Sequence, residues 1–210
     1  MVTRKPYMEV MKLTRRILLP MLLVAALPVS AAEKLSLNSL SRYLNDMTTA
    51  KGAFTQINDD GTIATGTIFI KRPGRIRFEY DPPAPVLVMA GGGQVAIFDT
   101  KSNQPPEQYP LKRTPLNLIL QRNVNLAAED MVVGHTFDGT ATSVVAQDPE
   151  HPDYGTISLV FTGPPVELRQ WVITSADGTK TTVILGDMQP NAQMAASLFS
   201  IPTEVQKRVR

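Results

Sequence analysis

Two consecutive segments in the first half of the chain alternate apolar and polar residues with the period of a β-strand. Residues 62–72 and 75–80 are rich in β-branched and aromatic side chains, and Pro73-Gly74 separates them. Further runs of this kind lie at 53–57, 86–90, 94–99, 131–135, 140–146, 156–161, 168–174 and 181–185. Because glycine-containing turns separate several of these runs, the pattern predicts an antiparallel meander.

Two apolar segments have helical spacing instead. Ser36 is a candidate N-cap for a helix in which Leu37, Leu40, Tyr43, Leu44 and Met47 share one face. Thr114, followed by Pro115, is a candidate N-cap for a leucine-rich helical segment that reaches Gln121. The polar stretch 101–110 interrupts the strands, and the basic end at 207–210 is expected to fray. These patterns predict one mainly β domain of about ten strands and two or three short helices.

Arg72 has the same strand parity as Ile68 and Ile70, which places an arginine on an apolar face. Burial of an unpaired charge is costly, so Arg72 must either extend to the rim of that face or find hydrogen-bond acceptors inside a cavity. The sheet could fill its own interior, or it could curve around a cavity that the helical segments cover. Arg72 favours the cavity, because the ends of short helices offer free carbonyl groups as acceptors.

The N-terminal segment has the organisation of a secretory signal peptide. Basic residues precede an apolar run at 17–27, and small residues at 29–32 predict cleavage after Ala31 or Ala32. The run is too short to span a membrane, so residues 1–31 are read as a signal peptide and 32–210 as one domain in the periplasm. The chain has no cysteine, which excludes disulfide bonds and a lipid-modified N-terminal cysteine as an anchor.

The charge changes when the signal peptide is set aside. The chain carries 21 basic and 19 acidic residues, and the signal segment holds five of the basic and one of the acidic ones. The remainder is therefore slightly acidic, with a net charge of −2, and a nucleic-acid partner is not expected.

No catalytic or metal-binding pattern stands out. His135 and His151 lie far apart in the sequence, and no nucleophile has an evident base beside it. Gly91-Gly92-Gly93 precedes a predicted strand, whereas a phosphate-binding loop would precede a helix. We expect neither an enzyme, nor a cofactor, nor a metal.

The chain resembles the LolA family of periplasmic lipoprotein carriers in a series of short motifs that occur along its length. The shared motifs are Phe54-Thr55-Gln56, Gly66, Ile68 to Pro73, Phe78-x-Tyr80, Val86-Leu87-Val88, Val95 to Asp99, Thr114-Pro115-Leu116, Arg122-Asn123 and Phe199-x-Ile201-Pro202. The resemblance implies a curved antiparallel half-barrel of ten or eleven strands with short helices as a lid over a hydrophobic cavity. It also implies a monomeric chaperone that takes acylated lipoproteins from an inner-membrane ABC transporter to an outer-membrane acceptor, or to the membrane itself.

The resemblance also assigns residues. It implies that Arg72 bonds the carbonyls of lid residues Leu44, Ile119 and Leu120 and so holds the empty cavity shut. The cavity lining that follows from it is Phe54, Ile68, Ile70, Ile76, Phe78 and Leu116. Ile76 stands where well-known members of the family have an aromatic residue.

Two alternatives stay open at this point. A soluble protein of the LolB type could both carry and insert lipoproteins, with the proline-rich loop 81–86 against the membrane. A half-barrel envelope-stress sensor is the other alternative, although such a sensor should carry a second domain for its partner.

Overall fold

The computed structural model of the chain describes residues 1–2, 33–99, 101–102, 104–127 and 130–208. The predicted signal peptide, residues 1–31, lies almost wholly outside the described residues. The strands are β1 (Thr49–Ile57), β2 (Ile63–Lys71), β3 (Ile76–Tyr80), β4 (Val86–Gly91), β5 (Gln94–Asp99), β6 (Glu107–Pro110), β7 (Val132–Phe137), β8 (Thr142–Gln147), β9 (Thr156–Thr162), β10 (Glu167–Thr174), β11 (Lys180–Leu185) and β12 (Gln189–Pro190). The α-helices are α1 (Leu37–Asp46), α2 (Leu116–Leu120) and α3 (Ile201–Arg208), and the 3-10 helices are η1 (Leu111–Arg113), η2 (Pro152–Tyr154) and η3 (Ala196–Phe199).

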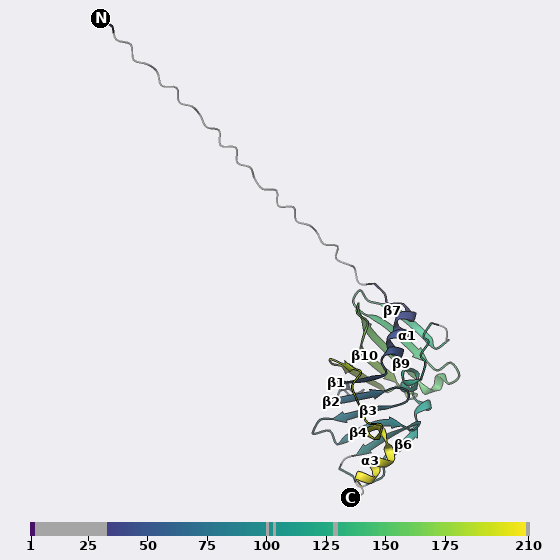
Figure 1. Cartoon of the computed structure of the whole chain (residues 1–210). Helices are drawn as coiled ribbons and strands as arrows, with labels where there is room; N and C mark the ends of the chain where they lie inside the picture. The colour runs from purple at the N-terminus through teal and green to yellow at the C-terminus, as the bar shows by residue number, and fades with distance from the viewer. Residues whose placement is uncertain (3–32, 100, 103, 128–129, 209–210) are drawn as a thin grey trace. The chain divides into compact units, whose positions relative to one another are not determined.

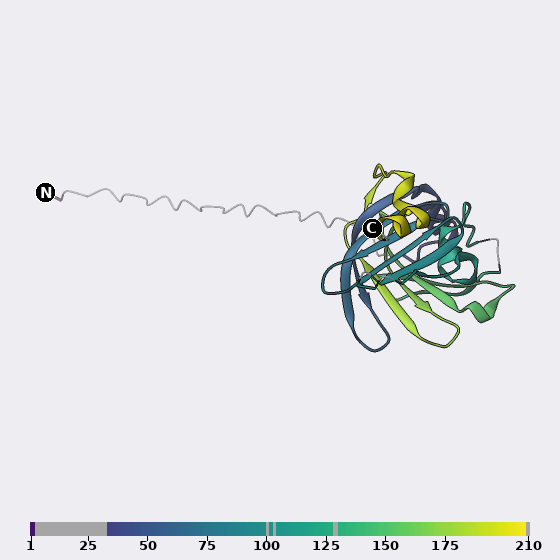
Figure 2. The same ribbon diagram turned by 90° about the horizontal axis from the view of Figure 1, so that it is seen from below.

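All the strands belong to one antiparallel sheet, as the alternation predicts. Eleven of them follow the order β6-β5-β4-β3-β2-β1-β11-β10-β9-β8-β7, and the short β12 pairs with β1. The sheet is strongly curved but stays open, with β6 and β7 at its two ends (Figures 1 and 2). The expected half-barrel is therefore confirmed. β6 was not predicted, because residues 101–110 are polar and an edge strand needs no apolar run.

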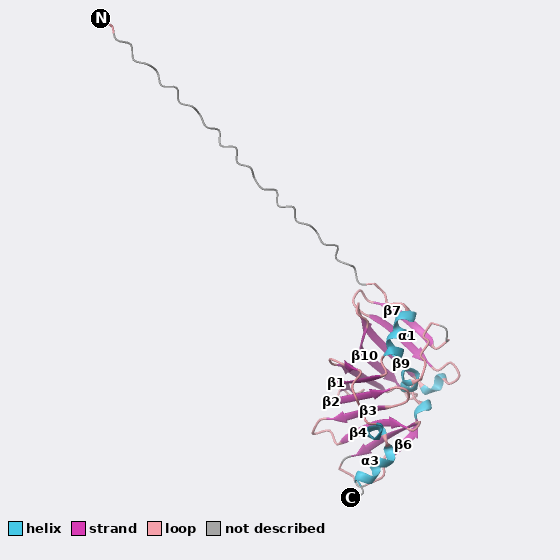
Figure 3. Cartoon of the chain, viewed as in Figure 1, coloured by secondary structure: helices cyan, strands magenta, loops and turns pink. Residues whose placement is uncertain are grey.

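The helices are few and short beside the sheet (Figure 3). α1 begins where the sequence predicts, since the Ser36 hydroxyl accepts a hydrogen bond from the backbone N–H of Ser39 at 3.2 Å. The predicted cap at Thr114 is wrong: its hydroxyl donates to the Leu111 carbonyl at 2.8 Å and closes η1, while Pro115 precedes α2. None of the described helices has both the length and the apolar character that crossing a bilayer requires.

The two faces of the sheet bury different residues. The inner face carries Phe54, Ile68 and Ile70, which form the main hydrophobic core together with side chains from α1 and α2. The outer face of β4 and β5 is also buried, because α3 covers it there. This second core consists of Leu87, Met89, Ala96, Phe98 and Ile201, with Val205 packed against it.

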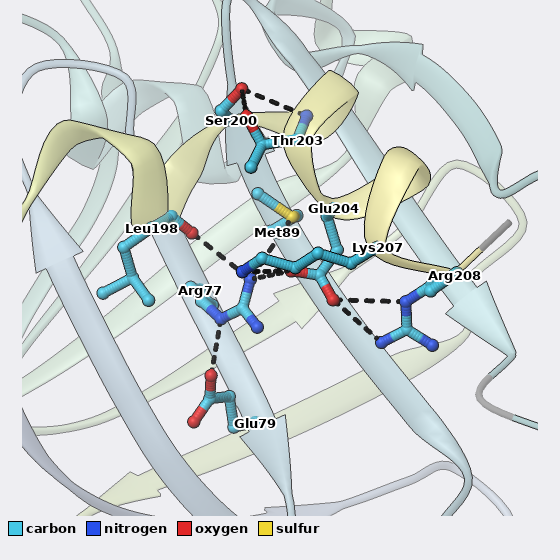
Figure 4. Close-up of polar contacts among 9 residues, drawn as sticks. All are labelled: Arg77, Glu79, Met89, Leu198, Ser200, Thr203, Glu204, Lys207 and Arg208. Atoms are coloured by element: carbon cyan, nitrogen blue, oxygen red, sulfur yellow. Dashed lines mark hydrogen bonds and ion pairs between the residues drawn. The ribbon is translucent and has the colours of Figure 1, made fainter. Parts of the chain in front are cut away.

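A buried ion pair fastens α3 to the outer face (Figure 4). Arg77 of β3 donates to Glu204 at 3.1 Å, to Glu79 at 2.7 Å and to the Leu198 carbonyl at 3.2 Å. Arg208 donates to the other Glu204 oxygen at 3.2 Å. The expected frayed C-terminus is thus wrong as far as residue 208, because Glu204 and Arg208 belong to a packed helix whose partner lies over a hundred residues away in the sequence.

Loss of this ion pair should destabilise the fold. Burial by itself would raise the pKa of the Glu204 carboxyl, but the charges of Arg77 and Arg208 outweigh it and hold that pKa below its usual 4.5. We expect Glu204→Gln to lower the free energy of unfolding by about 1.5–3 kcal/mol at neutral pH, because the buried Arg77 loses its charged acceptor.

The pH dependence of this effect has a defined sign. Because the pKa of Glu204 is lower in the folded state, its ionised carboxylate contributes fully to the free energy of unfolding above about pH 4.5. This contribution decreases as the pH falls below that value. Urea unfolding of both proteins from pH 7 to pH 3 should show their difference shrinking in acid. Lys207→Gln is the matched control, since Lys207 is exposed and 3.9 Å from Glu204, and an equal loss in both variants would contradict the assignment.

Candidate functional site

Arg72 lies immediately after β2, on the inner face of the sheet. Its backbone N–H donates to the Thr48 carbonyl at 2.8 Å, which pairs the end of the strand with the segment that follows α1. The side chain is directed toward the helices that cover this face, and only 9% of the residue is exposed. A buried guanidinium in this position needs acceptors from the covering segments.

The Arg72 guanidinium donates hydrogen bonds to two neutral acceptors. Nη2 donates to the Gln121 carbonyl at 2.6 Å, and the Asn45 side-chain oxygen lies 3.3 Å away. Nε has no partner among the described residues. Burial lowers the pKa of Arg72 from its ordinary value, and no carboxylate pairs with it in the described part of the chain. We call Arg72, Asn45 and Gln121 the latch.

Asn45 ties together the segments above the inner face. Its Oδ1 also accepts from the Val124 backbone N–H at 2.9 Å, and its Nδ2 donates to the Val124 carbonyl at 2.8 Å. Nearby, the Ser41 hydroxyl accepts from the Leu126 N–H at 2.9 Å. α1 is thereby bonded to residues 121–126, and we call α1, α2 and residues 121–126 the lid. Sequence reasoning missed Asn45, because a polar residue late in a helix gives no distinguishing signal.

The carbonyls expected to receive Arg72 are not its acceptors. The Leu120 carbonyl instead accepts from the Gly74 N–H at 2.8 Å, and the arginine uses Gln121, the next residue. On the α1 side the acceptor is the Asn45 side chain in place of the Leu44 carbonyl. The side chains of Leu44, Ile119 and Leu120 are buried in the main core. Arg72 thus bonds residues next to the expected ones, and its acceptors are one or two positions along the chain from Leu44, Ile119 and Leu120.

An apolar cavity of about 540 Å³ lies between the sheet and the start of the lid helix α2. Its apolar wall includes Phe78, Val88, Val95, Leu116, Trp171 and Val183. Its polar lining includes Gln56, Tyr80, Tyr109, Arg113, Tyr154 and Thr181. The volume is within the 300–1,000 Å³ that is usual for ligand pockets.

Two of the six predicted cavity residues, Phe78 and Leu116, line this cavity. The other four are packed in the closed core: Phe54, Ile68, Ile70 and Ile76, each at most 2% exposed. Trp171 on β10 and Val183 on β11 line the cavity although the prediction omitted them. Strand alternation alone could not select them, because it does not say which strands face one another across a curved sheet.

Aromatic side chains pack edge-on around the cavity. Phe54 lies 5.3 Å from Phe78 and 5.1 Å from Tyr80 between ring centroids, and Phe78 lies 6.3 Å from Trp171. The Tyr80 hydroxyl donates to the Gln56 side chain at 2.7 Å. Burial raises the pKa of Tyr80 to about 12, so the phenol is neutral at physiological pH.

Two residues of the cavity lining connect η1 with the β8–β9 connection. The guanidinium of Arg113, in η1, lies 5.8 Å from the centre of the Tyr154 ring, which in turn stacks on His151. Among the described residues, no group of three or more histidine and acidic side chains is arranged to hold a metal ion. The cavity lining combines apolar side chains with a few polar groups, which is the usual composition of a pocket for a largely apolar ligand.

Comparison with known proteins gives consistent matches. A family model described as "Outer membrane lipoprotein carrier protein LolA" matches residues 45–202. An outer-membrane lipoprotein carrier protein from Pseudomonas aeruginosa is 24% identical over 200 residues, covering 90% of this chain and 94% of its own. A protein of the same description from Nitrosomonas europaea is 26% identical, covering 89% and 94%. A solved LolA superfamily protein from Nitrosomonas europaea aligns with 79% of this chain and 98% of its own at 11% identity and a TM-score of 0.40.

Removal of the Asn45 side chain should loosen the lid. Asn45→Ala leaves the backbone N–H and carbonyl of buried Val124 without partners, which costs about 1–3 kcal/mol in the free energy of unfolding. We expect faster hydrogen exchange at the Val124 amide, measured by NMR. Asn117→Ala is the control, because Asn117 is on α2 and makes no side-chain hydrogen bond among those of the described residues. Unchanged Val124 exchange in Asn45→Ala would show that the lid does not depend on Asn45.

Proposed function

The chain belongs to the LolA family of outer membrane lipoprotein carrier proteins, and on that premise we propose that it is a periplasmic lipoprotein chaperone. It binds the acyl chains of lipoproteins that an inner-membrane ABC transporter releases. It then delivers them to an acceptor at the outer membrane, or to the membrane itself. The function is carriage and involves no catalysis. The observation that carries the proposal is the latch, a buried arginine that bonds the lid across an apolar interior.

The apolar interior has two parts in this proposal. The cavity of about 540 Å³ receives the first acyl chain, because Phe78, Trp171 and Leu116 offer it apolar contacts. Phe54, Ile68, Ile70 and Ile76 lie under the closed lid and become the wall for further chains when the lid moves. Arg72 is the switch between these states, since its bonds to Gln121 and Asn45 exist only while the lid is closed.

The energetics explain why a carrier needs such a latch. Each buried methylene contributes about 0.8 kcal/mol, so one long acyl chain contributes on the order of 10 kcal/mol. A chain bound that tightly would not be released on a useful timescale. Closure of the lid competes with the ligand, and the apparent affinity falls by the fraction of molecules that are open. Cargo can then pass to an acceptor with a more accessible apolar surface, without nucleotide hydrolysis at the handover.

Native mass spectrometry of protein recovered from the periplasm tests the cargo. We expect acylated polypeptide to co-purify with the wild-type chain, and to be lost from Phe78→Glu and Ile97→Glu, which place a charge in the apolar cavity. Val133→Glu is the control, since Val133 is 58% exposed on β7. Folding of each variant is checked by circular dichroism. Full loading of the folded Ile97→Glu protein would place the cargo elsewhere.

The latch is tested by Arg72→Leu. Without the guanidinium the closed lid loses charge-assisted hydrogen bonds, which are worth about 1.5–3 kcal/mol, so the open fraction should rise tenfold or more. We expect a folded protein that loads lipoprotein and releases it to acceptor membranes at least about tenfold more slowly. Arg75→Leu is the control, because Arg75 lies in the same β2–β3 corner and makes no side-chain hydrogen bond within the described structure. Release as fast as that of the wild type would refute the latch.

A further inference from the structure

The single tryptophan of the chain, Trp171, is in the middle of β10, opposite Leu159 on β9 and Val183 on β11. The residue is fully buried, and its ring forms part of the cavity wall beside Phe78. The side chain of tryptophan is amphipathic, because its large apolar ring carries one N–H donor. Phenylalanine, already used at Phe54 and Phe78, would offer the apolar ring without the donor.

The indole Nε1–H of Trp171 has no hydrogen-bond acceptor among the described residues. Native proteins pair most of their buried donors, and one left unpaired costs about 1–3 kcal/mol. The only other buried side-chain atom in this condition within the described part of the chain is Nε of Arg72, whose guanidinium already has two acceptors. Trp171 therefore stands out as a donor that the protein itself does not satisfy.

Two polar side chains of the cavity already bond other residues, and none of the described residues accepts from the indole. The Tyr80 hydroxyl is bonded to the Gln56 side-chain oxygen, and the Gln56 amide group donates to Asn58. The neighbours of Trp171 are apolar, since Leu159 and Val183 lie opposite it on the adjacent strands and Phe78 packs against its ring. An acceptor for Trp171 must therefore come from a ligand, and it must be a group that tolerates apolar surroundings.

The chemistry of the donor and of its surroundings defines that acceptor. An indole N–H can only donate, so the ligand must present an oxygen with a free lone pair. A carboxylate or phosphate beside the indole would lose its hydration against apolar side chains, and the cationic residue of the lining, Arg113, is exposed and lies against Tyr154 instead. A neutral carbonyl at the head of an acyl chain meets both conditions, since the chain fills the apolar cavity and the oxygen meets the N–H.

We propose that Trp171 is a specificity-determining residue, whose Nε1–H donates a hydrogen bond to the carbonyl oxygen of an acyl group held in the cavity. The inference rests on the proposed function, and it goes further in that it sets the ligand class. The cavity selects acyl esters and amides over ether-linked or purely hydrocarbon chains of equal length. Leu116 of the lid helix lines the same cavity, so a chain that enters as the lid moves comes within reach of the indole.

The test compares two lipids that differ only in the carbonyl. Dioctanoylglycerol and its diether counterpart, dioctylglycerol, are each titrated into the mature wild-type protein, with displacement of a bound fluorescent fatty acyl probe as the measure of affinity. A neutral hydrogen bond that satisfies a buried donor is worth about a factor of ten in affinity. We expect the ester to bind about tenfold more tightly than the ether.

Two variants locate the source of this preference. Trp171→Phe keeps an aromatic ring and removes the donor, so the roughly tenfold preference for the ester should disappear, while any loss of apolar contact weakens the ester and the ether alike. Tyr109→Phe is the matched control, because it removes another aromatic donor from the same cavity and should leave the preference intact. Loss of the preference in Tyr109→Phe, with retention in Trp171→Phe, would overturn the inference.

Nuclear magnetic resonance of the wild type gives a second readout that needs no variant to fold. Since the chain has one tryptophan, it has one indole N–H signal. The ester should move this signal downfield, as hydrogen bonding to the indole requires, and the ether should not. Equal binding of both lipids with the same indole shift would refute the ester preference and leave the carrier proposal intact. Failure of both lipids to displace the probe would instead refute the carrier proposal together with this inference.

Discussion

The buried guanidinium of Arg72 joins the end of β2 to the lid through two neutral acceptors, and in our proposal it controls whether the inner face is open or closed. Its desolvation opposes folding, and its bonds to Gln121 and Asn45 compensate for much of that cost without a counter-charge. The net strength of such an arrangement is small compared with the free energy of a buried acyl chain. A lid held in this way can stay closed over an empty interior and still yield to a ligand.

The outer face gives the sheet a source of stability that does not depend on the lid. Successive residues of a strand point to opposite faces, so Lys71 bonds the Met194 carbonyl outside the sheet while Arg72 bonds the lid inside it. Arg77 and Glu204 then fix α3 over the second core. If the lid opens and the inner core is exposed, β3 to β5 remain covered on their other side. The sheet can therefore persist as a folded scaffold in both states.

The sequence predicted most of the strands, because alternation of apolar and polar residues is a local signal and glycine marks several of the turns between them. Contacts between segments that are distant in the sequence could not be predicted from local patterns. Arg77 and Glu204 are 127 positions apart, and no local pattern distinguishes a pairing glutamate from a solvated one. In the same way the parity of Arg72 predicted an inward arginine, whereas its acceptor Asn45 depends on how α1 crosses the sheet. The family resemblance indicated which segments form the lid, whereas the acceptor atoms of Arg72 are visible only in the structure.

The composition of the cavity also bears on how a carrier avoids binding its cargo too well. A purely apolar cavity would gain affinity with every methylene and would accept any hydrocarbon, including the chains of the bilayer itself. A donor such as the Trp171 indole acts differently, because it raises the affinity only for a ligand that places an oxygen at one depth in the cavity. A ligand without that oxygen leaves the buried N–H unpaired and binds less tightly. Selectivity then comes from the position of the acyl carbonyl, and the total affinity can stay within the range that closure of the Arg72 latch is able to oppose.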